Sequence, residues 1–110
     1  MTIYNKLVRD RIPEIIKEQG KSCSTRILSL EDFKNKLREK LQEEVKEYLD
    51  TTSKDQAVEE LSDVLEVVYS LAKMHGVTFS DIEKARIKKG EERGGFTERV
   101  LLEEVFNNTA

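Results

Sequence analysis

Residues 43–63 read EEVKEYLDTTSKDQAVEELSD, and they carry two acidic pairs on either side of a polar break at residues 50–55. The pairs are Glu44 with Glu47 and Glu60 with Asp63, each spaced by three residues. Residues three apart are neighbours on a helix surface, and the polar break is suited to a turn. We therefore predict two antiparallel helices that bring four carboxylates to one place.

A helical wheel of roughly 100° per residue places these acids on the core-facing sides of the two helices. Glu44 falls in the middle of the first apolar stripe, with Glu47 on its flank. Glu60 falls among apolar residues of the second helix, with Asp63 at their edge. Such breaks of the binary pattern are expected at functional sites, because poorly hydrated carboxylates repel one another unless a cation is present. The alternative is two solvated helices with ordinary surface acids.

The type of ligand selects the type of metal. Oxygen ligands favour a hard cation, so Mg²⁺ is predicted first and Mn²⁺ second. Zinc is disfavoured, because the single histidine and single cysteine have no spacing that joins them into a site. The predicted ligands are Glu44, Glu47, Glu60 and Asp63, with Glu43 as an outer member of the cluster. Mg²⁺ held in this way keeps positions for substrate phosphates, which suggests nucleotide chemistry.

The acidic spacing also resembles a known signature. Glu43–Glu47 and Glu60–Asp63 match the E-E-x-x-E and E-x-x-D motifs of the all-α nucleotide pyrophosphohydrolases, which include MazG, the dimeric dUTPases and phosphoribosyl-ATP pyrophosphohydrolase. Residues 4–13, YNKLVRDRIP, and 89–96, KGEERGGF, are similar to a MazG-related house-cleaning branch. The resemblance spans nearly the whole chain. It implies an all-α, MazG-like helical bundle and Mg²⁺-dependent hydrolysis of a nucleoside triphosphate, including non-standard ones, to monophosphate and pyrophosphate.

Within this mechanism, Glu44 or Glu47 would accept a proton from the attacking water. Basic side chains would stabilise the leaving pyrophosphate. The candidates are Lys6, Arg9 and Arg11 near the N-terminus, and Lys89 and Arg93 near the paired glycines. Solvated surface charges, and a helix end followed by a turn, are the alternatives for these two segments. The chain has no P-loop, so a glycine-rich phosphate cradle of that type is excluded.

Two other functions stay open. One is hydrolysis of phosphoribosyl-ATP in histidine biosynthesis, which the acidic motif cannot separate from other nucleotide hydrolysis because it binds metal and phosphates rather than the base. The other is a non-catalytic helical interaction module whose acids bind a structural cation or a basic partner. Two roles are also open for His75. It is either a general base or, as we favour, a partner for a helix C-terminal dipole.

Composition limits the class of protein. The 110 residues predict one domain, residues 1–110, and the 37% charged and 6% aromatic content favours helices over a β-sandwich. Residues 41–70 carry 9 acidic and 2 basic side chains, a pattern unlike the basic stripe of a nucleic-acid-binding module. No membrane-length apolar run or signal peptide is visible, and Cys23 is alone, so we expect a cytoplasmic protein that binds no membrane.

Capping signals predict four helices. They run from about Asp10 to Gly20, from Ser29 to about Leu49, from Ser53 to about His75–Gly76, and from Ser80 to about Glu92. The third has apolar residues over more than half of its circumference, which is more than a surface helix needs. The other helices of one small chain would struggle to cover it. We therefore expect a homodimer, or a higher homo-oligomer, to complete the core.

Overall fold

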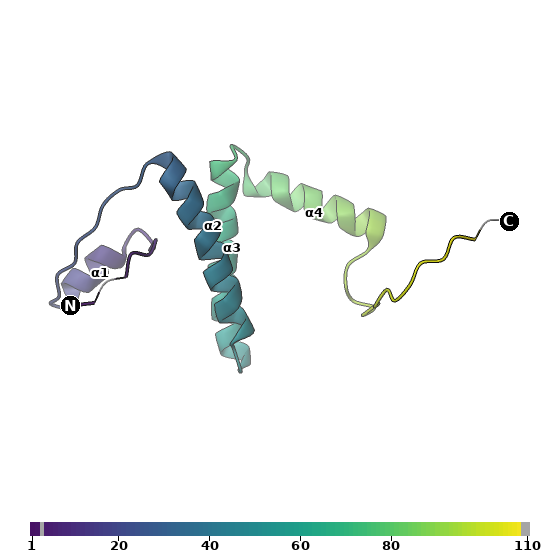
Figure 1. Ribbon diagram of the computed structural model, residues 1–110, viewed down its shortest axis with the longest axis horizontal. Helices are drawn as coiled ribbons and strands as arrows, with labels where there is room; N and C mark the ends of the chain where they lie inside the picture. The colour runs from purple at the N-terminus through teal and green to yellow at the C-terminus, as the bar shows by residue number, and fades with distance from the viewer. Residues whose placement is uncertain (3, 109–110) are drawn as a thin grey trace. The chain divides into compact units, whose positions relative to one another are not determined.

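The computed structural model describes residues 1–2 and 4–108, and these residues form four helices and no strand (Figure 1). The helices are α1 (Ile12–Glu18), α2 (Leu30–Leu49), α3 (Lys54–Met74) and α4 (Phe79–Arg93). The predicted all-α class is therefore confirmed. All four helices lie where the sequence predicted them, to within two residues at each boundary.

Serine caps start the two long helices. The Ser29 hydroxyl accepts a hydrogen bond from the Asp32 backbone N–H at 3.2 Å, and Ser53 accepts one from the Gln56 N–H at 3.2 Å. Each bond satisfies a backbone donor that the first helical turn leaves unpaired. The Gln56 side chain reaches back to the Thr52 N–H at 3.1 Å, one residue before the position that a capping box requires.

The structure corrects one prediction about the start of the last helix. The prediction that Ser80 caps it is wrong, because α4 already begins at Phe79. The Phe79 ring stacks on Tyr69 of α3, with ring centroids 4.0 Å apart. A tertiary contact of this kind can outweigh a local capping signal. The preceding helix ends as predicted, at Met74, with Gly76 in the left-handed region at φ +71°, where glycine has no steric penalty.

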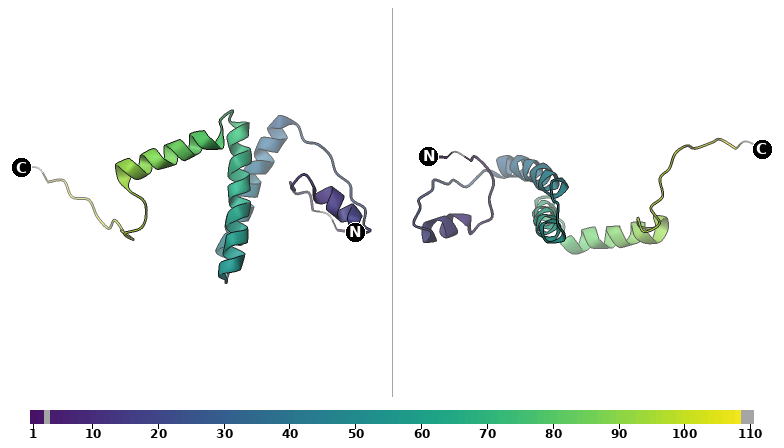
Figure 2. Two further views of the ribbon diagram at one scale, coloured as in Figure 1. Left: turned by 180° about the vertical axis from the view of Figure 1, so that it is seen from behind. Right: turned by 90° about the horizontal axis from the view of Figure 1, so that it is seen from below.

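The chain divides into two compact units, residues 1–79 and residues 80–110. In the first unit, α2 and α3 pack side by side as an antiparallel hairpin (Figures 1 and 2). Leu37, Val67 and Ala72 are the buried apolar residues of the described chain, at 3%, 7% and 2% exposure. This core is small, and the only buried charged residue beside it in the described chain is Glu44. The single-domain organisation of residues 1–110 stays a prediction.

One face of α3 remains apolar and open. Val58, Leu61, Leu65 and Tyr69 are 60%, 49%, 45% and 40% exposed, and their spacing places them along one side of the helix. This stripe is part of the wide apolar circumference that the sequence predicted for the helix. None of the described helices is long and apolar enough to cross a membrane.

Candidate metal centre

Five carboxylates from α2 and α3 converge around Glu44. Glu43, Glu44 and Glu47 each offer an oxygen within 4.8 Å of the others. Glu44, Glu60 and Asp63 form a second group with the same spread. The spacing of three residues places each pair on one helix face, and the antiparallel packing of the hairpin brings the two faces together. We call these five residues the carboxylate cluster.

Two oxygens in the carboxylate cluster lack partners. Glu44 is only 5% exposed, and its Oε2 atom is buried without a hydrogen bond. The Oε2 atom of Glu60 is buried and unpartnered in the same way. A buried carboxylate oxygen with no donor loses its hydration without compensation, which is unfavourable. A hard cation would compensate both atoms, so the donor set and its burial fit Mg²⁺ or a similar ion.

The protonation of Glu44 reflects this environment. Burial raises the pKa of its carboxyl above the ordinary value of 4.5, and the neighbouring Glu47 carboxylate raises it further. The hydrogen bond from Lys40 works in the opposite direction but does not outweigh burial. Without a cation, folding therefore favours the protonated form of Glu44.

Lys40 is a member of the site that our sequence analysis did not single out. Its Nζ atom lies 3.1 Å from Glu44 Oε1 and 3.6 Å from Glu43 Oε1. Burial works to lower the pKa of Lys40, but the hydrogen bond to Glu44 and the nearby acidic charges raise it overall. The signal was present in the sequence, because Lys40 precedes Glu44 by four residues and Glu43 by three.

Two predicted phosphate ligands contact the carboxylate cluster. Lys6 donates a hydrogen bond to Glu43 Oε1 at 3.1 Å, and Arg9 Nη2 donates one to Asp63 Oδ1 at 2.8 Å. Burial works to raise the pKa of Glu43, but Lys6 and Lys40 lower it overall. Arg11 behaves differently from its two neighbours, because its guanidinium pairs with Glu14 at 3.2 Å within α1.

A cavity of about 200 Å³ adjoins the carboxylate cluster. Its apolar wall comes from the N-terminal residues Leu7 and Val8 and from the hairpin. Its polar wall includes Glu44 and Asp63. The full lining is Leu7, Val8, Arg9, Asp10, Phe33, Leu37, Lys40, Glu44, Asp63, Glu66, Val67 and Ser70. Two of the four predicted ligands, Glu44 and Asp63, thus line this cavity.

Three further residues were considered in the sequence, two on α4 and one at the end of α3. Lys89 and Arg93 are exposed residues of α4, and their role toward phosphate stays a prediction. The helix ends at Arg93, and Gly94 follows at φ +79°, as a helix-ending turn requires. His75 is the C-terminal cap of α3, the position that suits a partner for the helix dipole.

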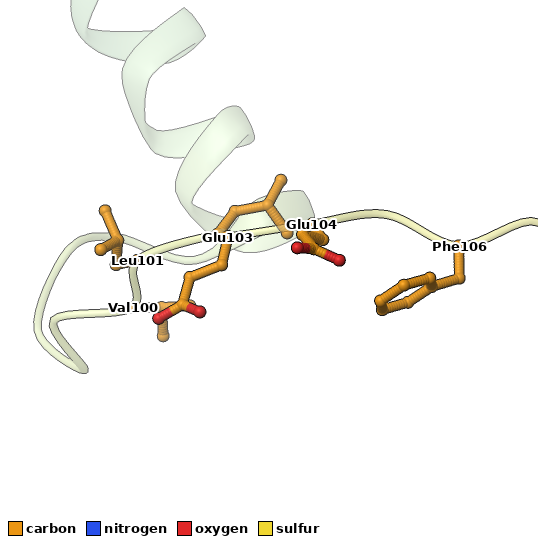
Figure 3. Close-up of a pocket in the computed structure, with 6 residues that line it drawn as sticks. Val100, Leu101, Glu103, Glu104 and Phe106 are labelled. Atoms are coloured by element: carbon orange, nitrogen blue, oxygen red, sulfur yellow. The ribbon is translucent and has the colours of Figure 1, made fainter.

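A second hollow runs along residues 100–106 (Figure 3). Its volume is about 520 Å³, but one continuous segment supplies every lining residue. Leu101 and Phe106 in that segment are 81% and 72% exposed. An open hollow of this kind encloses no ligand, so we assign no site to it.

Comparison with known protein families gives a match. A family model described as the MazG-like family matches residues 23–105, most of the chain. The chain belongs to the MazG-like family. No curated protein and no solved structure matches it. Membership confirms the resemblance to the all-α nucleotide pyrophosphohydrolases and indicates a nucleotide-hydrolysing type of function. The matched residues of this MazG-like chain include the whole carboxylate cluster, whereas Lys6 and Arg9 lie before them.

Proposed function

We propose that this MazG-like protein is a Mg²⁺-dependent pyrophosphohydrolase that converts nucleoside triphosphates, including non-standard ones, to monophosphate and pyrophosphate. The observation that carries the proposal is the buried Glu44 with its unpartnered oxygen, at the centre of five converging carboxylates. Ordinary surface acids would point to water, as most glutamates do. Family membership supports the type of chemistry, and the convergence of the carboxylates supports the hairpin as its location.

Glu44, Glu47, Glu60 and Asp63 would hold the ion, and Glu43 would lie at the edge of the group. Mg²⁺ comes first and Mn²⁺ second, because the ligands are all carboxylate oxygens. When bound, such an ion neutralises phosphate charge and lowers the pKa of a coordinated water. Lys40 holds the buried Glu44 carboxylate in place through their 3.1 Å ion pair.

Glu47 is the better candidate for proton acceptor. Its side chain is exposed, so water reaches the carboxylate, whereas Glu44 is buried and already accepts a hydrogen bond from Lys40. A general base must lie within hydrogen-bond reach of the water that it deprotonates. We therefore assign proton acceptance to Glu47 and not to Glu44, and both remain proposed ligands of the ion. No nucleophilic side chain is needed.

Lys89 and Arg93 are proposed to stabilise charge on the leaving pyrophosphate. Replacing either residue with glutamine should reduce kcat/KM about ten- to a hundredfold, because a charge-assisted contact contributes roughly 1.5–3 kcal/mol, and replacing both should reduce it by more than about a hundredfold. Metal affinity should stay unchanged. Steady-state kinetics, together with a Mg²⁺ titration, measure both quantities.

The matched control for this prediction is the double variant Arg86→Gln and Lys88→Gln. It removes the same charge from the same helix, where Arg86 pairs with Glu83 and Lys88 lies 3.9 Å from Glu92. Equal kcat/KM in wild type and the Lys89/Arg93 double variant would remove these two residues from the site.

We also propose that a second copy of the chain covers the exposed apolar stripe of α3. The stripe is wide for a surface that stays in water, and the core of the single chain is small. Sedimentation equilibrium should show a dimer or a higher homo-oligomer. Leu61→Glu should shift the protein toward monomer while far-ultraviolet circular dichroism still reports helix. A wild-type protein that sediments as a monomer at all concentrations would contradict this proposal.

The function itself is tested with a panel of standard and non-standard nucleoside triphosphates, incubated with Mg²⁺ or with EDTA. Phosphorus NMR should show a monophosphate and pyrophosphate as the initial products, and only in the presence of the metal. Initial formation of a diphosphate and orthophosphate would contradict the proposed bond cleavage.

Two results would select the alternatives. Activity on phosphoribosyl-ATP alone would place the chain in histidine biosynthesis, since the carboxylate cluster binds metal and phosphates and does not select the base. No pyrophosphate from any substrate would favour a non-catalytic helical module that binds a cation or a basic partner.

A further inference from the structure

The N-terminal segment, residues 4–10, has no helix or strand, yet it lies on the carboxylate cluster. Two ion pairs attach it there: Lys6 to Glu43 at 3.1 Å and Arg9 to Asp63 at 2.8 Å. These pairs join residues 37 and 54 positions apart in the sequence. Ion pairs between half-exposed side chains contribute little to stability. Their position on the carboxylate cluster therefore matters more than their strength.

The same segment borders the cavity beside the cluster. Leu7, Val8, Arg9 and Asp10 supply one side of its lining, and α2 and α3 supply the other. The cavity reaches Glu44 and Asp63, which are two of the proposed metal ligands. The segment therefore covers the approach to these carboxylates when its ion pairs are formed.

We propose that the N-terminal segment is a strap that competes with the divalent cation for the carboxylate cluster. This inference rests on the proposed metal site. In the metal-free protein, Arg9 and Lys6 supply positive charge to Asp63 and Glu43. A divalent cation on the same carboxylates weakens both pairs, because it repels the guanidinium and the ammonium and takes up the negative charge that held them. The strap is thereby released, and the cavity opens in the metal-loaded form.

Two simpler roles for Arg9 predict other effects of its removal on cation binding than competition does. If Arg9 served to orient Asp63 for the metal, removing it would weaken cation binding. If Arg9 were only a solvated surface charge, removing it would change cation binding no more than removing any nearby charge. Competition predicts a third result, in which removal of Arg9 tightens cation binding.

The first test is a calorimetric titration of nucleotide-free protein with Mg²⁺. Arg9→Gln should lower Kd about two- to fivefold, the range expected for removing one half-exposed competing charge. The matched control is Arg11→Gln, which removes the same charge two residues away, where the guanidinium pairs with Glu14 instead of the carboxylate cluster. A Kd for Arg9→Gln that is equal to or weaker than that of Arg11→Gln would overturn the proposal.

The second test measures the release of the N-terminal segment directly, by limited trypsin digestion. Trypsin must take the lysine or arginine side chain into its specificity pocket, so an ion-paired Lys6 is protected from cleavage. Mg²⁺ should raise the rate of cleavage after Lys6 about two- to fivefold in the wild type. It should not do so in Glu44→Gln, which controls for any effect of Mg²⁺ on trypsin.

The two possible failures are distinguishable. Metal binding with no change, or a decrease, in cleavage after Lys6 would overturn the strap and leave the metal site intact. No Mg²⁺ binding by either the wild type or Arg11→Gln would overturn the metal site, and the strap with it.

Discussion

Glu44→Gln should reduce kcat/KM for nucleoside triphosphate hydrolysis at least about a hundredfold, the largest loss expected for a single substitution in this chain. Glu44 belongs to both groups of converging carboxylates and is the most buried of the five. Glutamine keeps the shape of the side chain but removes its charge. The loss should therefore come from the missing ligand and not from unfolding, which circular dichroism checks.

Glu59→Gln is the matched control for this substitution. Glu59 lies on α3 beside Glu60, and its side chain is exposed. The same charge change should leave kcat/KM within about twofold, because surface substitutions away from a site have small effects. Equal losses in the two variants would show that overall charge, and not the carboxylate cluster, governs activity.

The raised pKa of Glu44 adds a dependence on pH. A group whose pKa is raised by folding stabilises the folded protein below its unfolded value, here about 4.5, and this contribution is lost as pH rises through the folded pKa. In EDTA, the Tm of the wild type minus that of Glu44→Gln should therefore fall as pH rises from 4 to 8. A difference that rises with pH would mean that Lys40 outweighs the burial of Glu44.

Glu60→Gln should reverse the usual effect of a substitution on stability. Glu60 holds a buried oxygen without a partner beside other carboxylates, so removing its charge relieves repulsion and incomplete hydration. In EDTA, this variant should melt at the same temperature as the wild type or higher. With Mg²⁺ at about a hundred times its Kd, the wild type should gain about 2.7 kcal/mol, which corresponds to a rise in Tm of roughly 10 °C or more.

The variant should gain much less from Mg²⁺, so the order of stability changes between the two conditions. Thermal melts of wild type, Glu60→Gln and the exposed Glu59→Gln, with EDTA and with Mg²⁺, measure this directly. Glu59→Gln should follow the wild type in both. A Glu60→Gln protein that is destabilised in EDTA and keeps the full Mg²⁺ shift would make Glu60 a structural residue.

Local signals in the sequence predicted most of the fold. Ser29 and Ser53 begin the two long helices because each hydroxyl accepts a bond from the first turn, and Gly76 ends the second because glycine tolerates a positive φ. These effects act over three or four residues, so they can be read without tertiary information. The prediction that Ser80 caps the last helix was wrong, since α4 begins one residue earlier, at Phe79, whose ring stacks on Tyr69.

In the candidate metal centre too, local contacts could be predicted from the sequence and the long-range contact could not. The burial of Glu44 could be predicted from helical periodicity, and the pairing of Lys40 with Glu44 follows from a spacing of four residues. The pairing of Arg9 with Asp63 could not, because 54 residues separate them and no helix or strand carries Arg9. The sequence left a phosphate ligand and a solvated charge as alternatives for Arg9, and it had no means of naming Asp63 as the anion that Arg9 contacts.

A titration of nucleotide-free protein with Mn²⁺, followed by electron paramagnetic resonance, tests the central claim most directly. It measures cation binding at the carboxylate cluster without relying on any substrate. Wild type and Glu59→Gln should both bind the ion, Mg²⁺ should displace it, and Glu44→Gln should lose at least about tenfold in affinity. Equal binding by all three proteins, or binding by none, would contradict a metal centre at Glu44.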